Sequence, residues 1–305
     1  RSSDLYANGK GIRIVGDIPI YVALDSADTW AHPELFQLDQ DNRPEAVAGC
    51  PPDGFSATGQ LWGNPIYRWD YHRMTGYDWW IKRLAYCYRL YDVVRIDHFR
   101  GFDEYFSIPA DAETAVDGHW EKGPGIELFR RVKEALGEKE IIAEDLGYVT
   151  DSVRQLVRET GYPGMKVLEF AFDSRDSGCA SDYLPHNYPE NSVAYTGTHD
   201  NETIAGWFRS ITPQERKLAR DYLCDNYTPV KRLHLPFISL VMRSQARMCI
   251  IPLQDYMGLD NDCRINTPST VGKNWKWRLE PGQLSEGLLE EIASMTKRFG
   301  RWNWD

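Results

Sequence analysis

The sequence predicts an α/β fold, a (β/α)8 TIM-type barrel of which this chain carries six of the eight strands. Each of six short apolar runs breaks into polar residues where a strand would end, and helical patterns separate the runs, as in β/α units. The runs lie near residues 12–16, 92–96, 140–143, 166–172, 193–197 and 248–253. A six-stranded doubly wound sheet is the alternative. Long loops that follow the strands on one side favour the barrel.

A barrel two strands short of eight is expected to form an open arc. We expect its first two strands to precede residue 1, so that the barrel is incomplete at its N-terminal side. Removing two neighbours exposes two strand edges, because barrel strands are hydrogen-bonded on both sides. The gap would be left exposed or filled by another copy of the chain.

Composition limits the classes of partner. The chain of 305 residues can bury one large core, so we predict a single domain spanning residues 1–305. A net charge of −10 without a basic block argues against nucleic acid and anionic membrane. The six cysteines are widely spread without a CxxC motif, which is typical of reduced thiols in a cytoplasmic protein. No apolar run approaches about 18 residues.

Helix boundaries can be placed from capping residues. The run Thr212-Pro213-Gln214-Glu215 combines an N-cap, proline at the first helical position and glutamate at the third, which predicts a helix start. An amphipathic helix is predicted over residues 126–136, stopped by Gly137. Another begins at Thr150 or Asp151 and runs to about residue 161. The other helices are expected near residues 71–90, 202–208, 231–246 and 285–301.

Three long segments, at about residues 31–78, 102–124 and 256–280, are predicted to be irregular loops on the barrel rim. Structureless stretches of this length inside a compact domain are usually functional. The centre of the first segment offers the apolar faces of Phe55 and Trp62 beside polar groups. Those polar groups belong to Asp53, Ser56, Gln60 and Asn64. Sugars need both kinds of contact, so we predict a binding lid, with an inert proline-stiffened loop as the alternative.

The stretch D-V-V-R-I-D-H-F-R-G, residues 92–101, holds the first candidate catalytic acid. Its β-branched run reads as a buried strand, and Asp97 stands where the strand ends. Chemistry in a β/α barrel lies at this carboxyl face. Arg95, two residues earlier on the same strand face, can hold Asp97 ionised. A purely structural ion pair is the alternative.

Two more carboxylates, Glu144 and Asp200, follow other strands. Retaining glycoside chemistry needs a nucleophilic carboxylate and a second carboxyl group as acid/base, which strand ends on one rim can supply. Metal binding is the rival use. The close His–acid neighbours are Asp97-His98 and His199-Asp200, and no HxH or HExxH motif occurs, so we expect no metal.

Longer motifs then add a family resemblance. They are G-I-R-I-V-G-D-I-P-I-Y-V, P-P-D-G-F-S-A-T-G-Q-L-W-G-N-P, R-I-D-H-F-R-G, A-E-D-L-G, G-T-H-D-N and P-L-Q-D. Together they resemble the amylomaltase (disproportionating enzyme) family of 4-α-glucanotransferases, in the α-amylase clan. The resemblance runs from about residue 9 to the end. It implies a barrel of that clan without a separate C-terminal β-sandwich, and the family's N-terminal portion is not in this chain.

The resemblance also implies roles. Asp97 would be the nucleophile, Glu144 the general acid/base and Asp200 the transition-state stabiliser. The expected substrate-binding residues are Asp17, Phe55, Gln60, Trp62, Arg95, His98, His199, Asn201, Asp255 and Asn266. Gly54 departs from the family, where many members carry an aromatic residue, so that side of the lid would grip less.

The implied reaction is transfer of α-1,4-glucan segments between maltooligosaccharides, without cofactor or metal. Three other readings stay open. They are a hydrolase of the same clan, a catalytically impaired glucan-binding fragment, and an unrelated metal-dependent barrel enzyme.

Overall fold

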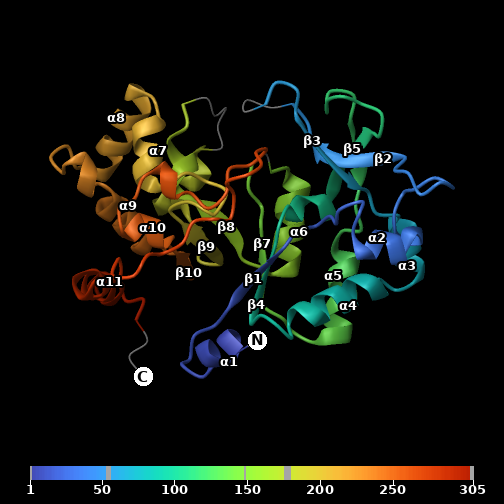
Figure 1. The fold of residues 1–305 in the computed structure, drawn as a ribbon, viewed down its shortest axis with the longest axis horizontal. Helices are drawn as coiled ribbons and strands as arrows, with labels where there is room; N and C mark the ends of the chain where they lie inside the picture. Colours follow the sequence, from blue (N-terminus) through green and yellow to red (C-terminus); the bar gives the residue numbers. More distant parts are fainter. Residues whose placement is uncertain (1, 53–55, 148, 175–179, 303–305) are drawn as a thin grey trace. The chain divides into compact units, whose positions relative to one another are not determined.

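The computed structural model describes residues 2–52, 56–147, 149–174 and 180–302. The chain, drawn in Figure 1, forms two compact units, Arg1–Gly164 and Met165–Asp305.

The first unit is built on parallel strands. β4 (Val93–Ile96) lies between β1 (Val15–Ile18) and β7 (Ile141–Ala143) and pairs in parallel with both. Ala143 pairs in turn with Gly164, the first residue of β8 (Gly164–Val167). Every residue of β4 is buried, as expected for a strand covered on both faces of a parallel sheet.

The second unit continues the same order. The rest of β8 is followed by β9 (Ser192–Tyr195) and β10 (Met248–Ile250), and β9 and β10 pair in parallel. The hydrogen-bonded order is β1-β4-β7-β8-β9-β10, which is also the order along the chain. Six strands interleaved with helices confirm the α/β fold and the strand count.

Three strands end earlier than predicted, and one of them, expected over residues 193–197, ends at Tyr195. The strand expected over residues 166–172 ends at Val167, and Leu168–Phe172 forms the 3-10 helix η3. The strand expected over residues 248–253 ends at Ile250. A short apolar run reads the same in a strand and in a buried helical turn, so periodicity alone could not place these ends.

Helices of the first unit cover its parallel strands. α5 packs against both α4 and α6 (Figure 1). The predictions of α5 and α6 are confirmed, with Thr150 as the N-cap of α6 and Gly161 as its C-cap. The helices are α1 (Ser2–Asn8), α2 (Ala27–Ala31), α3 (Trp69–Met74), α4 (Asp78–Cys87), α5 (Ile126–Leu136) and α6 (Asp151–Thr160).

In the second unit, α8 (Pro213–Leu223) begins at its predicted cap, whereas the helices expected from residues 202 and 231 begin at Ile204 and His234. Thr212 and Glu215 form the full capping box of α8. Pro236 is the third residue of α9, so it marks the start of that helix. The helices are α7 (Ile204–Ser210), α8 (Pro213–Leu223), α9 (His234–Met242), α10 (Leu253–Tyr256) and α11 (Glu286–Arg298).

A second sheet contradicts the prediction that residues 31–78 and 102–124 are irregular. Four antiparallel strands, in the order β3-β2-β5-β6, form within these segments. The strands are β2 (Ala46–Cys50), β3 (Gln60–Pro65), β5 (Glu104–Pro109) and β6 (His119–Lys122). The pairing of β2 with β5 joins residues far apart in the sequence, and glycine and proline interrupt the strands, so no local pattern revealed them.

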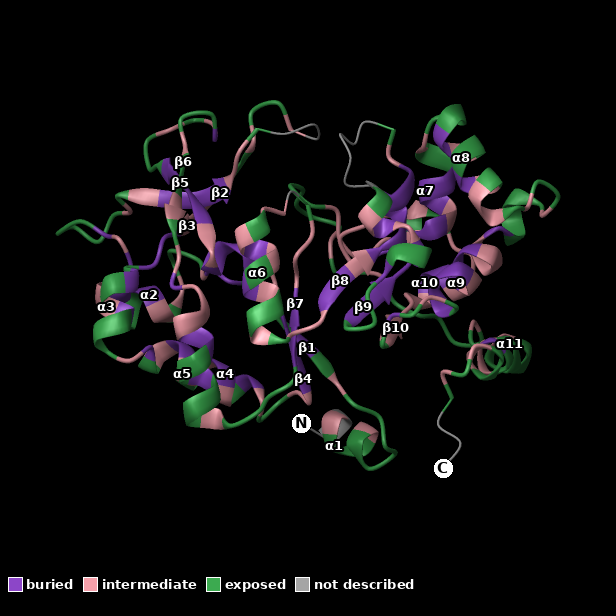
Figure 2. Cartoon of the chain, turned by 180° about the vertical axis from the view of Figure 1, so that it is seen from behind, coloured by how far each residue is buried: buried purple, intermediate pink, exposed green. Residues whose placement is uncertain are grey.

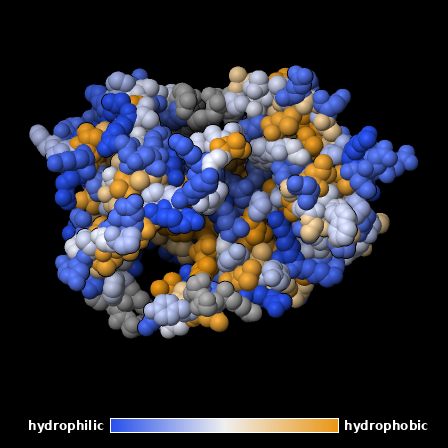
Figure 3. Space-filling model, in the orientation of Figure 1, coloured by the Kyte–Doolittle hydropathy of each residue, from blue (hydrophilic) through white to orange (hydrophobic). Residues whose placement is uncertain are grey.

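Burial is greatest in the central parallel strands and lower in β1 and β10. β4 and β9 are buried along their whole length, whereas α11 is mostly exposed (Figure 2). On the face drawn in Figure 3, hydrophobic residues are interspersed among hydrophilic ones. Within the described part of the chain, no helix combines the length and apolar character that crossing a bilayer requires.

Candidate active site

Arg95 organises the acids at the end of β4. Only 7% of the residue is exposed. Its Nη1 lies 2.7 Å from Asp17 Oδ1, and its Nη2 lies 3.1 Å from Asp97 Oδ1. Burial alone would lower the pKa of the guanidinium, but Asp17 and the neighbouring acids raise it overall. The predicted Arg95–Asp97 pair is confirmed.

Asp17 lies inside β1 rather than after it. The structure extends this strand to Ile18, beyond the predicted end at residue 16. Asp17 therefore stands directly opposite Arg95 in the β1–β4 register. Asp17 is thus held within β1, whereas Asp97 lies in the turn directly after β4.

Glu144 follows β7 and is held by backbone groups. Its carboxylate accepts hydrogen bonds from the N–H of His98, at 2.7 Å, and of Leu146, at 2.9 Å. Burial raises the pKa of Glu144 most, followed by the charge of Asp97. Arg95 and the two backbone N–H groups oppose this, and the pKa settles at about 7. Burial is thus a larger cause of the raised pKa than the neighbouring carboxylate of Asp97.

His98 follows Asp97 in the sequence, and its backbone N–H donates to Glu144. Its φ of 53° lies in the left-handed region, which is costly for a residue with a side chain and is often found at functional sites. Its buried Nε2 has no hydrogen-bond partner among the described residues. Burial, and then Arg100, lowers the pKa of His98 to about 3, so the imidazole is neutral.

Trp62 stands beside this cluster. Its ring meets the His98 ring edge-on, with centroids 4.8 Å apart and an interplanar angle of 88°. Its Nε1 donates to Gln60 Oε1 at 3.0 Å, so Gln60 orients the indole within β3. Phe55, the other expected stacking residue, lies outside the described residues, as do Asp53 and Gly54.

In the second unit, Asp200 is held by its surroundings. Asn266 Nδ2 donates to Asp200 Oδ1 at 2.6 Å, and Arg264 Nη2 donates to the Asp200 carbonyl at 2.7 Å. His199 Nε2 lies 3.2 Å from Asp200 Oδ2, and the His199 ring packs 5.2 Å from that of Trp275. Asn266 and His199 thus hold the Asp200 carboxylate, and Arg264 holds its backbone carbonyl.

Asn201 and Asp255 support the loop after β9. Asn201 Oδ1 accepts from the N–H and the hydroxyl of Thr198, at 2.9 and 2.7 Å. Asp255 is fully buried, accepts the N–H of Ile204 at 2.8 Å and is hydrogen-bonded by the hydroxyl of Thr196. Burial raises the pKa of Asp255 to about 6 against these hydrogen bonds. Both oxygens of Asp255 face protein groups, so it holds the loop and the start of α7.

Two residues near these groups were not among the predicted site residues. Arg264 binds the Asp200 carbonyl, and Glu169 is buried in η3 near the loop after β9. Arg264 could have been suspected from its place two residues before Asn266 in a polar segment. Glu169 could not, because it falls in an apolar run predicted to be a strand.

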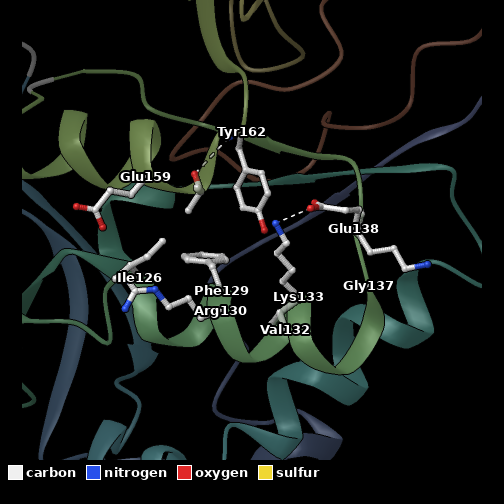
Figure 4. Close-up of a pocket in the computed structure, with 11 residues that line it drawn as sticks. Ile126, Phe129, Arg130, Val132, Lys133, Gly137, Glu138, Glu159 and Tyr162 are labelled. Carbon is white, nitrogen blue, oxygen red and sulfur yellow. Dashed lines mark hydrogen bonds and ion pairs between the residues drawn. The ribbon is translucent and has the colours of Figure 1, made fainter.

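The first unit also has a cavity of about 300 Å³ between α5 and α6. Phe129 and Tyr162 line it, and Lys133 forms an ion pair with Glu138 at its edge (Figure 4). None of the predicted site residues lines this cavity.

The cluster at the ends of β4 and β7 has the groups that acid/base and nucleophilic chemistry need. Asp97 lies against a permanent cation, whereas Glu144 titrates near neutrality. Pairs of carboxyl groups whose environments set different protonation states divide the roles of nucleophile and acid.

Comparison with known proteins places this cluster in a family. A family model described as 4-alpha-glucanotransferase matches residues 1–285. The 4-alpha-glucanotransferases of Streptococcus pneumoniae and Thermus thermophilus are 49% and 48% identical to the chain, over 98% and 96% of its length. The chain spans 58% and 59% of those proteins.

A solved structure agrees. The amylomaltase from Streptococcus agalactiae in complex with acarbose matches with a TM-score of 0.93 at 44% identity, over 99% of this chain and 60% of that one. Since the family model and these relatives match nearly the whole chain, the protein belongs to the 4-alpha-glucanotransferase family.

Proposed function

We propose that the protein is a 4-α-glucanotransferase that moves α-1,4-glucan segments between maltooligosaccharides by a retaining double displacement. The observation that carries the proposal is the pairing of Glu144, whose pKa is raised to about 7, with an Asp97 held by Arg95. A proton donor effective near neutral pH beside an anchored carboxylate is what retaining glycoside chemistry requires.

The first half-reaction breaks the donor. Glu144 gives its proton to the glycosidic oxygen while Asp97 attacks the anomeric carbon and forms a covalent glucosyl-enzyme. Arg95 keeps Asp97 oriented. In the second half-reaction the 4-hydroxyl of an acceptor glucan attacks the anomeric carbon while Glu144 takes its proton. The bond to Asp97 breaks, the Asp97 carboxylate is released, and an α-1,4 bond forms with retention.

Asp200 and Trp62 complete the proposal. Family membership supports a transition-state role for Asp200, with His199 and Asn266 beside it. Stacking of a sugar on Trp62 would exclude water and favour transfer over hydrolysis. We propose further that residues 1–305 form one catalytic domain, that the segments near residues 31–78, 102–124 and 256–280 border its site, and that the protein is cytoplasmic.

Disproportionation of maltotriose tests the proposal. Glu144→Gln and Asp97→Asn should each lower transfer by about three orders of magnitude or more without loss of fold, because each removes a group that acts on the reacting atoms. Glu134→Gln, at an exposed ion pair on α5, is the matched control and should behave like the parent. Activity near the parental level in either acid variant would contradict the assignment.

The product ratio separates the remaining readings. The parent should form maltooligosaccharides longer than maltotriose, together with no more short sugar than the transfer itself releases. A hydrolase would release short sugars without longer products. Binding without turnover would identify a glucan-binding protein instead. Trp62→Ala should raise the hydrolysed share, and an unchanged ratio would assign the indole a structural role.

A further inference from the structure

Glu169 is a buried carboxyl group that the proposed reaction does not use. It lies in η3 of the second unit and is 6% exposed. Its backbone N–H donates to the Thr196 carbonyl, 3.3 Å away, just beyond β9. Its Oε1 is buried and has no hydrogen-bond partner among the described residues. Buried polar atoms of this kind are rare in folded proteins and call for an explanation.

The carboxyl group lies directly against the turn that carries Asp200. A Cβ built on Gly197 would come within 2.7 Å of Glu169 Oε1 and within 3.1 Å of Asn201 Cβ. Only glycine allows so close an approach. The turn is then closed by its own bonds, since the Asp200 N–H donates to Thr198 Oγ1 at 3.2 Å.

We propose that Glu169 is a positioning residue, which packs against the Gly197–Asn201 turn and thereby holds Asp200 in place. The inference rests on the proposed function, because it affects transfer only if Asp200 takes part in the reaction. Glu169 itself touches neither substrate nor reacting atoms in this assignment.

The charges around Glu169 favour its neutral form. Burial, then Asp255 and Glu202, raises the pKa of Glu169 well above its usual range, while Arg264 and the Glu202 backbone act in the opposite direction. An ionised Glu169 would place a further negative charge beside two acids. It would also compete for Arg264, whose Nη2 holds the Asp200 carbonyl. A protonated carboxyl group fills the space without disturbing that contact.

Two substitutions separate shape from charge. Glu169→Gln keeps the shape of a neutral acid, so kcat/KM should stay within about twofold of the parent. Glu169→Ala removes the support, and kcat should fall by about tenfold or more with little change in KM, because the loss falls on transition-state contacts. If Glu169→Gln lowers kcat as much as Glu169→Ala does, the assignment of a neutral acid is wrong. If Glu169→Ala leaves kcat unchanged, Glu169 is not a positioning residue.

Glu215 provides the matched control. It is also 6% exposed and lies in the same unit. Burial raises its pKa, but hydrogen bonds from Ser174 and Thr212 outweigh this and lower it overall, so Glu215 is ionised. Glu215→Gln should therefore lower the melting temperature while leaving kcat unchanged. If Glu169→Gln shows that same pattern, the carboxyl group is a structural anion and the proposal is wrong.

A measurement without substrate keeps this inference separate from the proposed function. Amide hydrogen exchange of Gly197–Asn201 should speed up in Glu169→Ala but not in Glu169→Gln. Carbon-13 spectra of labelled glutamate should show Glu169 still protonated at a pH at which Glu215 is already ionised, because the pKa of Glu169 is raised and that of Glu215 is lowered. Unchanged exchange in the alanine variant would refute the support of the turn, even in an active enzyme. A parent without transfer activity would refute the proposed function alone.

Discussion

At the scale of residues, backbone geometry sets the protonation of the proposed acid. In the left-handed conformation of His98, its N–H donates to the Glu144 carboxylate. Arg95, which lies in β4, pairs with Asp97. Burial and the charge of Asp97 raise the pKa of Glu144, and Arg95 and the backbone N–H groups offset only part of that rise. Two carboxyl groups of similar intrinsic acidity are given different tasks by what surrounds them.

A pH profile tests this division. Because the pKa of Glu144 is raised from its usual 4.5 to about 7, the proton it donates is present below pH 7 and is lost as the pH rises through that value. The kcat/KM for maltotriose should therefore fall on the alkaline side with an apparent pKa near 7. A flat profile between about pH 6 and 9 would show that Glu144 is not the titrating acid.

The same shift affects stability. The folded-state pKa of Glu144 lies above its unfolded value, so its contribution to the free energy of unfolding is fully present below about pH 4.5 and is lost as the pH rises to about 7. Replacing the ionisable group, as in Glu144→Gln, should flatten that part of the curve of stability against pH.

At the scale of elements, the antiparallel sheet depends on one close approach. In the pairing of β2 with β3, a Cβ on Gly49 would lie 2.1 Å from the backbone oxygen of Gln60. A backbone oxygen cannot move aside as a flexible side chain can. Gly49 therefore allows β2 to pair with the strand that carries Trp62.

Gly49→Ala should accordingly destabilise the fold by about 1–3 kcal/mol, the usual cost of overpacking. Gly287→Ala is the matched control, because this position lies within α11 and has no atom within 4 Å of the added Cβ. There alanine should stabilise by about 0.5–1 kcal/mol. Urea unfolding measures both. Equal and small effects would show that β2 and β3 can separate without cost.

At the scale of the whole molecule, each of the two units contains fully buried apolar side chains. Leu84 belongs to the core of the first unit and is fully buried. In the second unit, Phe237 is fully buried in α9 and packs against Trp207 and Phe208. Each unit therefore has the buried side chains that local cooperative unfolding requires.

Leu84→Ala and Phe237→Ala should each lower the free energy of unfolding by about 2–5 kcal/mol, because each leaves a cavity among buried side chains. Hydrogen exchange should show protection falling mainly in the unit that carries the substitution. An equal fall of protection throughout both units, for both variants, would mean that the chain unfolds as one cooperative body.

Features that local patterns encode could be predicted from the amino-acid sequence. The strand at β4, the capping box of α8 and the order of acids along the chain follow from periodicity, from capping chemistry and from motifs. Asp97 and Glu144 were found because polar residues after apolar strands are visible in one dimension.

Features that depend on partners distant in the sequence became visible in the folded chain. The β2–β5 pairing, the burial that raises the pKa of Glu144, and the contact of Glu169 with Gly197 each join segments separated along the chain. Their energies come from packing and desolvation, which a residue acquires only from its neighbours in space. Glu169 lies in an apolar run that the sequence predicts to be a strand, and in the structure it is a buried acid in η3.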